Sequence, residues 1–257
     1  MRHGFSLVEL SIVLVILGLL TGGILTGQSL IRAAELRSVV TEFQRYQTAT
    51  QTFRDKYFAL PGDMRNATEF WGAVNTSGSN GNCSAPGTSM GTGTQTCNGN
   101  GDGKLNQAYE NHRFWQHLAN AGLIEGTYTG TQHLTTNDRT PGINIPVSRL
   151  GSATGWGVNH DTIDATHSTW FPMIAHVFEF GKDRSDWGAT DPVVTSEEAW
   201  NIDTKLDDGL PGTGKVTVPK SSAAGYTGCS TTDSASTAKY GLQSTGLTCA
   251  FKFLTPF

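Results

Sequence analysis

The feature that most constrains this chain is an apolar segment near the N-terminus that follows directly after a carboxylate. Met1–His3 form a short basic leader, Gly4 and Phe5 come next, and Leu10–Leu20 are almost uniformly apolar. Glu9 stands immediately before that run. A charged side chain at the centre of a bilayer helix costs about 2.5–3.5 kcal/mol on insertion scales. If lipid or other apolar groups surround this segment, the charge of Glu9 therefore needs a partner that neutralises it.

An ordinary secretory signal accounts poorly for these residues. Such a signal also has a basic region and an apolar region, but it needs a small-residue cleavage site after the apolar block. Thr21–Gly23 and Ile24–Gly27 are weak candidates for that site. The stretch Gly4–Leu10 instead resembles the type III signal of type IV pilins and of the pseudopilins of type II secretion, because glycine, phenylalanine and an acid four residues later precede an apolar run.

The resemblance implies how the chain is processed and where it goes. In that family a membrane enzyme, the prepilin peptidase, cuts after the glycine and methylates the new amino terminus, so residues 1–4 are a leader, the cut follows Gly4 and the methylated residue is Phe5. The implied partners are copies of the chain in a helical homopolymer, other pilins and the inner-membrane assembly platform. The chain is expected in the bacterial inner membrane before assembly. It then enters a cell-surface filament, with its head in the periplasm or outside the cell.

Elementary electrostatics gives Phe5 and Glu9 a role in assembly. A free α-amino group has a pKa of about 8, so a new amine on Phe5 is mostly charged at neutral pH. Opposite charges attract strongly in a medium of low dielectric constant. In a stack of identical helices the amine of one subunit can meet Glu9 of its neighbour and set the axial register. The alternative is an anchor that never polymerises, in which Glu9 is protonated or reaches toward the membrane surface.

The apolar segment is predicted to continue as an amphipathic helix. From Arg32 onward apolar side chains recur at spacings of three and four: Val39, Phe43, Tyr46, Thr50, Phe53 and Tyr57. Charged side chains fill the other faces: Glu35, Arg37, Glu42, Arg45, Arg54 and Asp55. Pro61 ends the pattern. The sequence thus predicts one helix from Phe5 to about Phe58, on the order of 80 Å long, with a membrane-spanning or filament-core part at 5–30 and an amphipathic continuation at 31–60.

Residues 61–257 are expected to form a globular head. Short helices are predicted at 63–72, 107–121 and 195–206, the last because Thr195 and Glu198 have the spacing of a capping box. The apolar side of the helix at 107–121 is marked by Phe114, Trp115, Leu118 and Ala121. Strand-like runs occur at 143–150, 169–180, 215–218 and 248–254. The predicted fold class is therefore α+β, in which a long N-terminal helix packs on a small, mostly antiparallel sheet. The pilin resemblance implies the same lollipop-shaped outline.

Four cysteines suggest an oxidising compartment and two disulfides. Cys83 and Cys97 bracket a loop rich in glycine, serine and asparagine, and Cys229 and Cys249 bracket a segment rich in serine and threonine. Four cysteines allow three connectivities, so cross-pairing stays open. A disulfide between Cys229 and Cys249 is similar to the disulfide-bounded region of type IV pilins, which major pseudopilins usually lack.

Two acidic loops are candidate calcium sites, and calcium is the one cofactor that the sequence suggests, although none is required. The first loop has oxygen-bearing side chains at positions one, three and five of an EF-hand-like stretch and glycine at position six, but its acid comes one residue late. The second follows a predicted helix and also has strong turn chemistry. The candidate ligands are Asn98, Asn100, Asp102 and Glu110 in the first loop, and Asp203, Asp207 and Asp208 in the second.

Other classes of function find little support. The formal net charge is −4 and the 18 lysines and arginines do not cluster, so no specific nucleic acid is predicted. His112 and His117 are five residues apart and do not share a helix face as zinc ligands would; we interpret them as surface or packing histidines. His160, Asp161 and His167 are expected in a polar loop with no ligand at the right spacing. No nucleophile elbow, phosphate loop or paired-cysteine redox motif occurs, so the chain is not expected to be an enzyme.

The function expected from the sequence is that of a structural subunit of a type IV pilus or pilus-like filament. The alternatives are a type II secretion pseudopilin, a monomeric membrane-anchored binding module such as an adhesin, and an anchored hydrolase. The late cysteine pair favours a pilin, whereas the length of the chain is more typical of a minor subunit. The choice between a major and a minor subunit stays open at this point.

Overall fold

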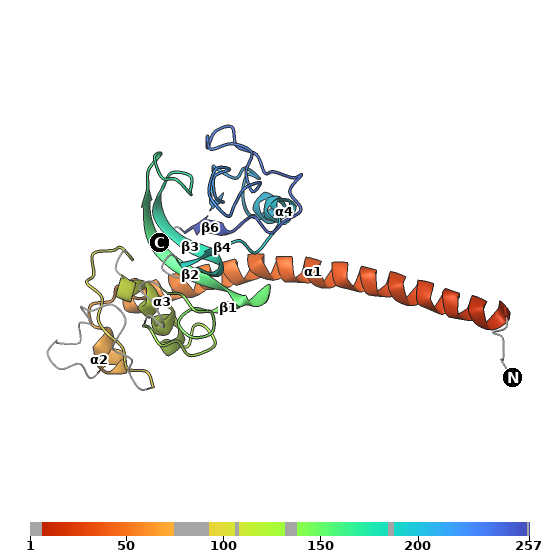
Figure 1. Cartoon of the computed structure of the whole chain (residues 1–257). Helices are drawn as coiled ribbons and strands as arrows, with labels where there is room; N and C mark the ends of the chain where they lie inside the picture. The colour runs from red at the N-terminus through yellow and green to blue at the C-terminus, as the bar shows by residue number, and fades with distance from the viewer. Residues whose placement is uncertain (1–6, 75–92, 106–107, 132–137, 185–187, 256) are drawn as a thin grey trace.

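One helix dominates the molecule. The computed structural model describes residues 7–74, 93–105, 108–131, 138–184, 188–255 and 257. Helix α1 runs without a break from Leu7 to Tyr57, which confirms the predicted long helix. Its N-terminal half projects away from the rest of the chain, and its C-terminal half lies along the head (Figure 1). The predicted boundary at residue 30 is not marked by any break in the helix, and the one at residue 60 lies three residues beyond its end; both stay predictions.

The head is built on an antiparallel sheet. Its strands are β1 (Val147–Ser148), β2 (Gly151–Ile163), β3 (Met173–Arg184), β4 (Gly188–Asp191), β5 (Val216–Thr217) and β6 (Phe251–Leu254). The order is β1-β2-β3-β6-β5, and β4 pairs with the C-terminal end of β3. In the central register Phe178 of β3 lies opposite Val158 of β2 and Phe253 of β6. The α+β fold class predicted from the sequence is therefore confirmed.

The strand predictions were only partly right. The longest strand, β2, and the short β4 were both missed, and the predicted strand at 143–150 contains only the two residues of β1. The predicted strand at 169–180 is shifted to Met173–Arg184. β2 contains glycine, asparagine, histidine and aspartate, which are poor strand formers. Its glycines permit close packing: a Cβ at Gly155 would lie 2.8 Å from the backbone oxygen of Pro146.

The described part of the head also contains three short helices. They are α2 (Ala67–Trp71), α3 (Ala108–Asn120) and α4 (Ser196–Leu206). α2 is half as long as predicted, because the residues before it form turns instead. The Thr195 side chain accepts a hydrogen bond from the Glu198 backbone and Glu198 bonds back to Thr195, so the predicted capping box is confirmed. Phe114, Trp115 and Leu118 of α3 are fully buried, as the apolar spacing predicted.

The main core lies between the sheet and the C-terminal half of α1. Even-numbered residues of β2 and β3 point toward α1, where Trp156 and Phe178 meet Phe43 and Tyr46. Val39 and Phe53 of α1 are completely buried there too. The opposite face of the sheet holds a smaller apolar cluster, made of Ile163, Trp170, Met173, Val177, Ala223, Tyr226 and Ala250. Cys229 and Cys249 form a disulfide with Cα atoms 5.2 Å apart, which ties the late loops to the start of β6.

Candidate assembly site

The N-terminal half of α1 exposes a continuous apolar surface. Leu7, Leu19 and Leu25 are 88%, 73% and 68% exposed, and their apolar neighbours are similarly open. Among the residues that the structure describes, α1 is the one helix long and apolar enough to cross a membrane. Monomeric soluble proteins rarely leave an apolar surface of this extent in water. Lipid or other helices must therefore cover it.

Glu9 lies in the first turn of α1. The positive end of the helix dipole stabilises a carboxylate at this position. Gly4 and Phe5, the predicted processing residues, lie outside the described residues. Farther along the helix a Cβ added at Gly18, Gly22, Gly23 or Gly27 would meet nothing within 4 Å. These glycines leave flat surface on which a second helix can approach closely.

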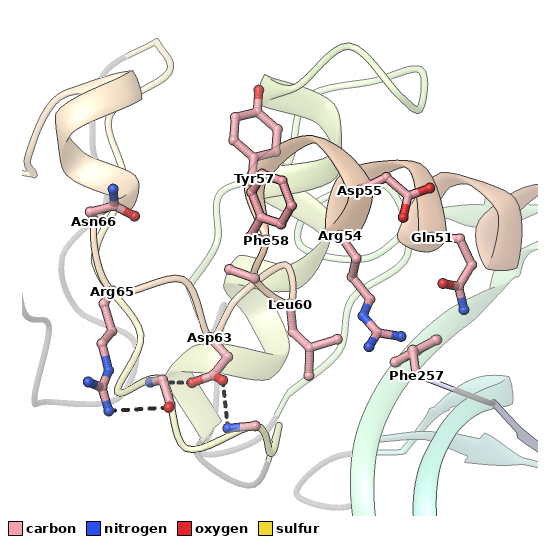
Figure 2. Close-up of a pocket in the computed structure, with 13 residues that line it drawn as sticks. Gln51, Arg54, Asp55, Tyr57, Phe58, Leu60, Asp63, Arg65, Asn66 and Phe257 are labelled. Atoms are coloured by element: carbon pink, nitrogen blue, oxygen red, sulfur yellow. Dashed lines mark hydrogen bonds between the residues drawn. The ribbon is translucent and has the colours of Figure 1, made fainter.

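The first predicted calcium loop is organised by a residue that the sequence did not single out. Asp63 accepts hydrogen bonds from the backbone nitrogens of Gly101, at 2.5 Å, and Gly103, at 2.9 Å (Figure 2). Asn100 and Asp102 accept backbone hydrogen bonds within the same loop. Glu110 is buried and accepts one from Asn100 at 3.2 Å. These oxygens thus already have donors inside the protein, and calcium at this loop stays a prediction.

Asp63 also lines the large cleft beyond the end of α1. This cleft has a volume of about 840 Å³ and is bordered by Arg54, Asp55 and Phe257 as well as by Arg65. Figure 2 shows side chains that line it, among them those of Arg54, Asp63 and Arg65. Burial raises the pKa of Asp63, although the backbone donors of Gly103 and Gly101 oppose that change. The predicted ligand Asn98 instead caps α2, because its Oδ1 accepts from Thr68 nitrogen at 2.9 Å.

The second predicted calcium loop brings its three carboxylates together. One oxygen each of Asp203, Asp207 and Asp208 lies within 4.8 Å of the others. Asp203 is buried and accepts a hydrogen bond from the Tyr240 hydroxyl at 2.8 Å. Burial raises the pKa of Asp203 to about 7. Asp207 accepts from the Lys215 and Val216 backbone. The arrangement suits a divalent cation, but acidic groups also gather in turns without one, so the site stays a prediction.

The histidines of α3 are packing residues. His117 is fully buried, and its Nδ1 accepts the backbone hydrogen of Gly62 at 2.9 Å. Burial lowers the pKa of His117 to about 3, so the ring is neutral. His112 is also buried and lies 2.9 Å from the backbone oxygen of Asp138. These contacts account for both side chains without a metal.

The predicted polar loop around His160 and Asp161 is wrong. Both residues lie within β2, and Asp161 is buried on the sheet face opposite α1. His167 does lie in the loop after β2, where its Nδ1 accepts backbone hydrogen bonds from Thr169 and Trp170. The alternation of β2 was hidden because polar residues occupy both of its faces.

Comparison with known families concerns the first tenth of the chain. Residues 1–25 match the family described as the prokaryotic N-terminal methylation motif. The chain carries the N-terminal signal of type IV pilins and pseudopilins. No curated protein and no solved structure matches the chain at a significant level. Together with the long helix on an antiparallel sheet, the motif makes this a type IV pilin-like protein.

Two charged residues hold the helix of this pilin-like protein in its head, and the sequence assigned neither of them that role. Arg32 donates two hydrogen bonds to Glu198 of α4, at 2.6 and 2.8 Å, just where the helix leaves the head. Glu42 was expected on a polar face, and that prediction is wrong. It is buried and accepts from Ser148 Oγ, from Arg149 nitrogen and from Trp156 Nε1, at 2.7, 3.0 and 2.8 Å. The helical periodicity of α1 could not reveal these hydrogen-bond donors, because they lie on β1, on β2 and between the two strands.

Proposed function

We propose that this pilin-like chain is a structural subunit of a type IV pilus or pilus-like filament. The observation that carries the proposal is the exposed apolar half of α1, which continues without a break into the half that packs on the head and which overlaps the methylation motif. Burial of about twenty apolar side chains per subunit supplies the driving force for polymerisation. Before assembly the apolar helix anchors the subunit in the inner membrane. In the filament the same helix lies in the core and the head faces outward.

Phe5 and Glu9 set the register of the assembled helices in this proposal. Cleavage after Gly4 creates the amine on Phe5, and Glu9 of a neighbouring subunit neutralises it. A pilin is favoured over a secretion pseudopilin by the disulfide between Cys229 and Cys249, which closes a late loop as in the pilin disulfide region. The role proposed for the chain in the filament is structural.

The mature N-terminus tests this function. Mass spectrometry of filaments sheared from cells is expected to find N-methyl-phenylalanine at Phe5 and no residue before it. A chain that keeps Met1, or that occurs only as a membrane-bound monomer, contradicts the proposal. Recovery of the subunit in the sheared fraction without overexpression separates a surface pilus from a pseudopilus, which stays inside the envelope.

A structural calcium ion at one of the two acidic loops is a second proposal. A ligand that binds only the folded state at 100 times its Kd stabilises it by about 2.7 kcal/mol. The thermal midpoint of the full chain in detergent is thus expected to rise in calcium and to fall in chelator. Asp208→Asn is expected to remove the difference if the second loop binds, and Asp102→Asn if the first does. Equal midpoints in calcium and chelator contradict both sites.

A further inference from the structure

Three buried charged residues meet on the sheet face that points away from α1. They are Asp161 of β2, Glu179 of β3 and Lys252 of β6. Lys252 Nζ lies 2.5 Å from Asp161 Oδ2 and 3.3 Å from Glu179 Oε1, and each of the three side chains is at most 6% exposed. The three strands are neighbours in the order β2-β3-β6, so Lys252 reaches across β3 to Asp161.

The three side chains line a cleft of about 340 Å³, and the residues around them leave them almost no exposed surface and orient their atoms. The Trp170 ring lies 4.8 Å from Lys252 Nζ, and Val177 of β3 is completely buried beneath. Asn159 Nδ2 donates to Asp161 Oδ1 at 2.7 Å, which leaves Oδ2 facing the lysine. Buried Arg139 binds the other oxygen of Glu179, so Oε1 is directed toward Lys252.

We propose that Lys252 and Asp161 condense to form an intramolecular amide bond, with Glu179 as the group that carries the proton. An ammonium and a carboxylate normally persist as ions because water solvates both. Here the two side chains are only 5% and 6% exposed, so most of that solvation is lost, and burial of two charges is costly even when they are paired. Burial accordingly lowers the pKa of Lys252, which brings the neutral amine within reach. Together with Arg139 the cluster holds four buried charges, and condensation reduces them to two, those of Arg139 and Glu179.

The reaction balances without any other reactant. Glu179 Oε1 takes a proton from the ammonium, and the lone pair of Lys252 Nζ forms a bond to Cγ of Asp161. Asn159 Nδ2 stabilises the negative charge that develops on Oδ1. The second proton leaves the nitrogen as the bond from Cγ to Oδ2 breaks. Oδ2 departs as water with the two protons, and Glu179 returns to its carboxylate form.

The bond would connect two strands that do not pair directly. It closes a loop between residues 161 and 252, which are 91 positions apart, and the disulfide at Cys249 already anchors the residues just before Lys252. In the chain-entropy model a crosslink across a loop this long stabilises the folded state, because it restricts the unfolded chain. The head would thus be locked across its central sheet, beneath the apolar core that faces α1.

The mass of the full chain tests the proposal directly. The chain purified in detergent and reduced is expected to be lighter than its sequence, with its N-terminus taken into account, by one water molecule. After trypsin digestion the peptide that contains Asp161 is expected to be joined to the peptide that contains Lys252, without cleavage after Lys252. An unchanged mass with the two peptides separate overturns the proposal and leaves an ion-pair network only.

Two variants, Asp161→Asn and Glu179→Gln, and one control, Lys252→Arg, separate formation of the amide bond from folding of the chain. In Asp161→Asn ammonia leaves in place of water, so the linked variant is expected to have the same mass as the linked natural chain. Glu179→Gln keeps both reacting groups but cannot take the proton, and it is expected to stay unlinked while retaining the natural circular-dichroism spectrum. Lys252→Arg, which keeps the positive charge but cannot form the amide, is the matched negative control. Full linkage in Glu179→Gln overturns the role of Glu179.

Discussion

Replacing Glu9 with leucine is expected to abolish filaments while the chain still enters the inner membrane. Leucine makes the N-terminal segment more apolar, so insertion is not weakened. The methylated amine of a neighbouring Phe5 then has no partner inside the filament core. If that charge costs about as much as one at the bilayer centre, about 2.5–3.5 kcal/mol, each subunit contact weakens by about 60-fold to 300-fold. Immunoblots of sheared and membrane fractions measure both expected results.

Two further substitutions at Glu9 serve as controls. Glu9→Gln keeps the shape but not the charge and is expected to fail as Glu9→Leu does. Glu9→Asp keeps the charge on a shorter side chain and is expected to retain part of the assembly. Normal filaments from Glu9→Leu would show that the register does not depend on this ion pair, even if the chain is a pilin.

Replacing Phe178 with alanine is expected to cost about 3–5 kcal/mol of the free energy of unfolding. Phe178 is completely buried at the centre of the core, and its ring lies 5.6–6.4 Å from six other aromatic rings. Those rings belong to Phe43, Tyr46, Phe114, Trp115, Trp156 and Phe257. Because they come from α1, α3, β2 and the C-terminus, the cavity would loosen the helix from the head. Urea unfolding of the full chain in detergent, followed by tryptophan fluorescence, measures the change.

Ile174→Ala is the matched control for Phe178→Ala. Ile174 lies on the same strand, four residues earlier and on the same face, but it is 78% exposed beyond the edge of the core. Its removal is expected to change the free energy of unfolding by less than about 0.5 kcal/mol. If both variants unfold at similar urea concentrations, the aromatic cluster does not hold the helix on the sheet.

Local patterns were sufficient where neighbouring residues carry the signal. The long helix followed from an unbroken apolar run and its amphipathic continuation, and it was found at Leu7–Tyr57. The capping box of α4 and the buried face of α3 followed from spacing in the same way. The N-terminal signal is equally local, because a few consecutive residues define it.

Patterns failed where a residue depends on distant strands. β2 was hidden because its glycines and polar residues lower strand propensity, and long-range pairing with β3 outweighed that preference. Glu42 was placed on a polar face because its three donors come from residues more than 100 positions away. Asp161 was assigned to a loop for the same reason, since its lysine partner lies on β6.

The amino-acid sequence by itself therefore determines the N-terminal signal and the long helix that follows it, because both are written in consecutive residues. The tertiary structure decides which buried charges meet. Glu42 pairs with donors on β1 and β2, and Asp161 meets Lys252 across β3, only after the sheet has formed. The reason is that a local pattern records periodicity, whereas the partner of a buried charge is set by strand order and register.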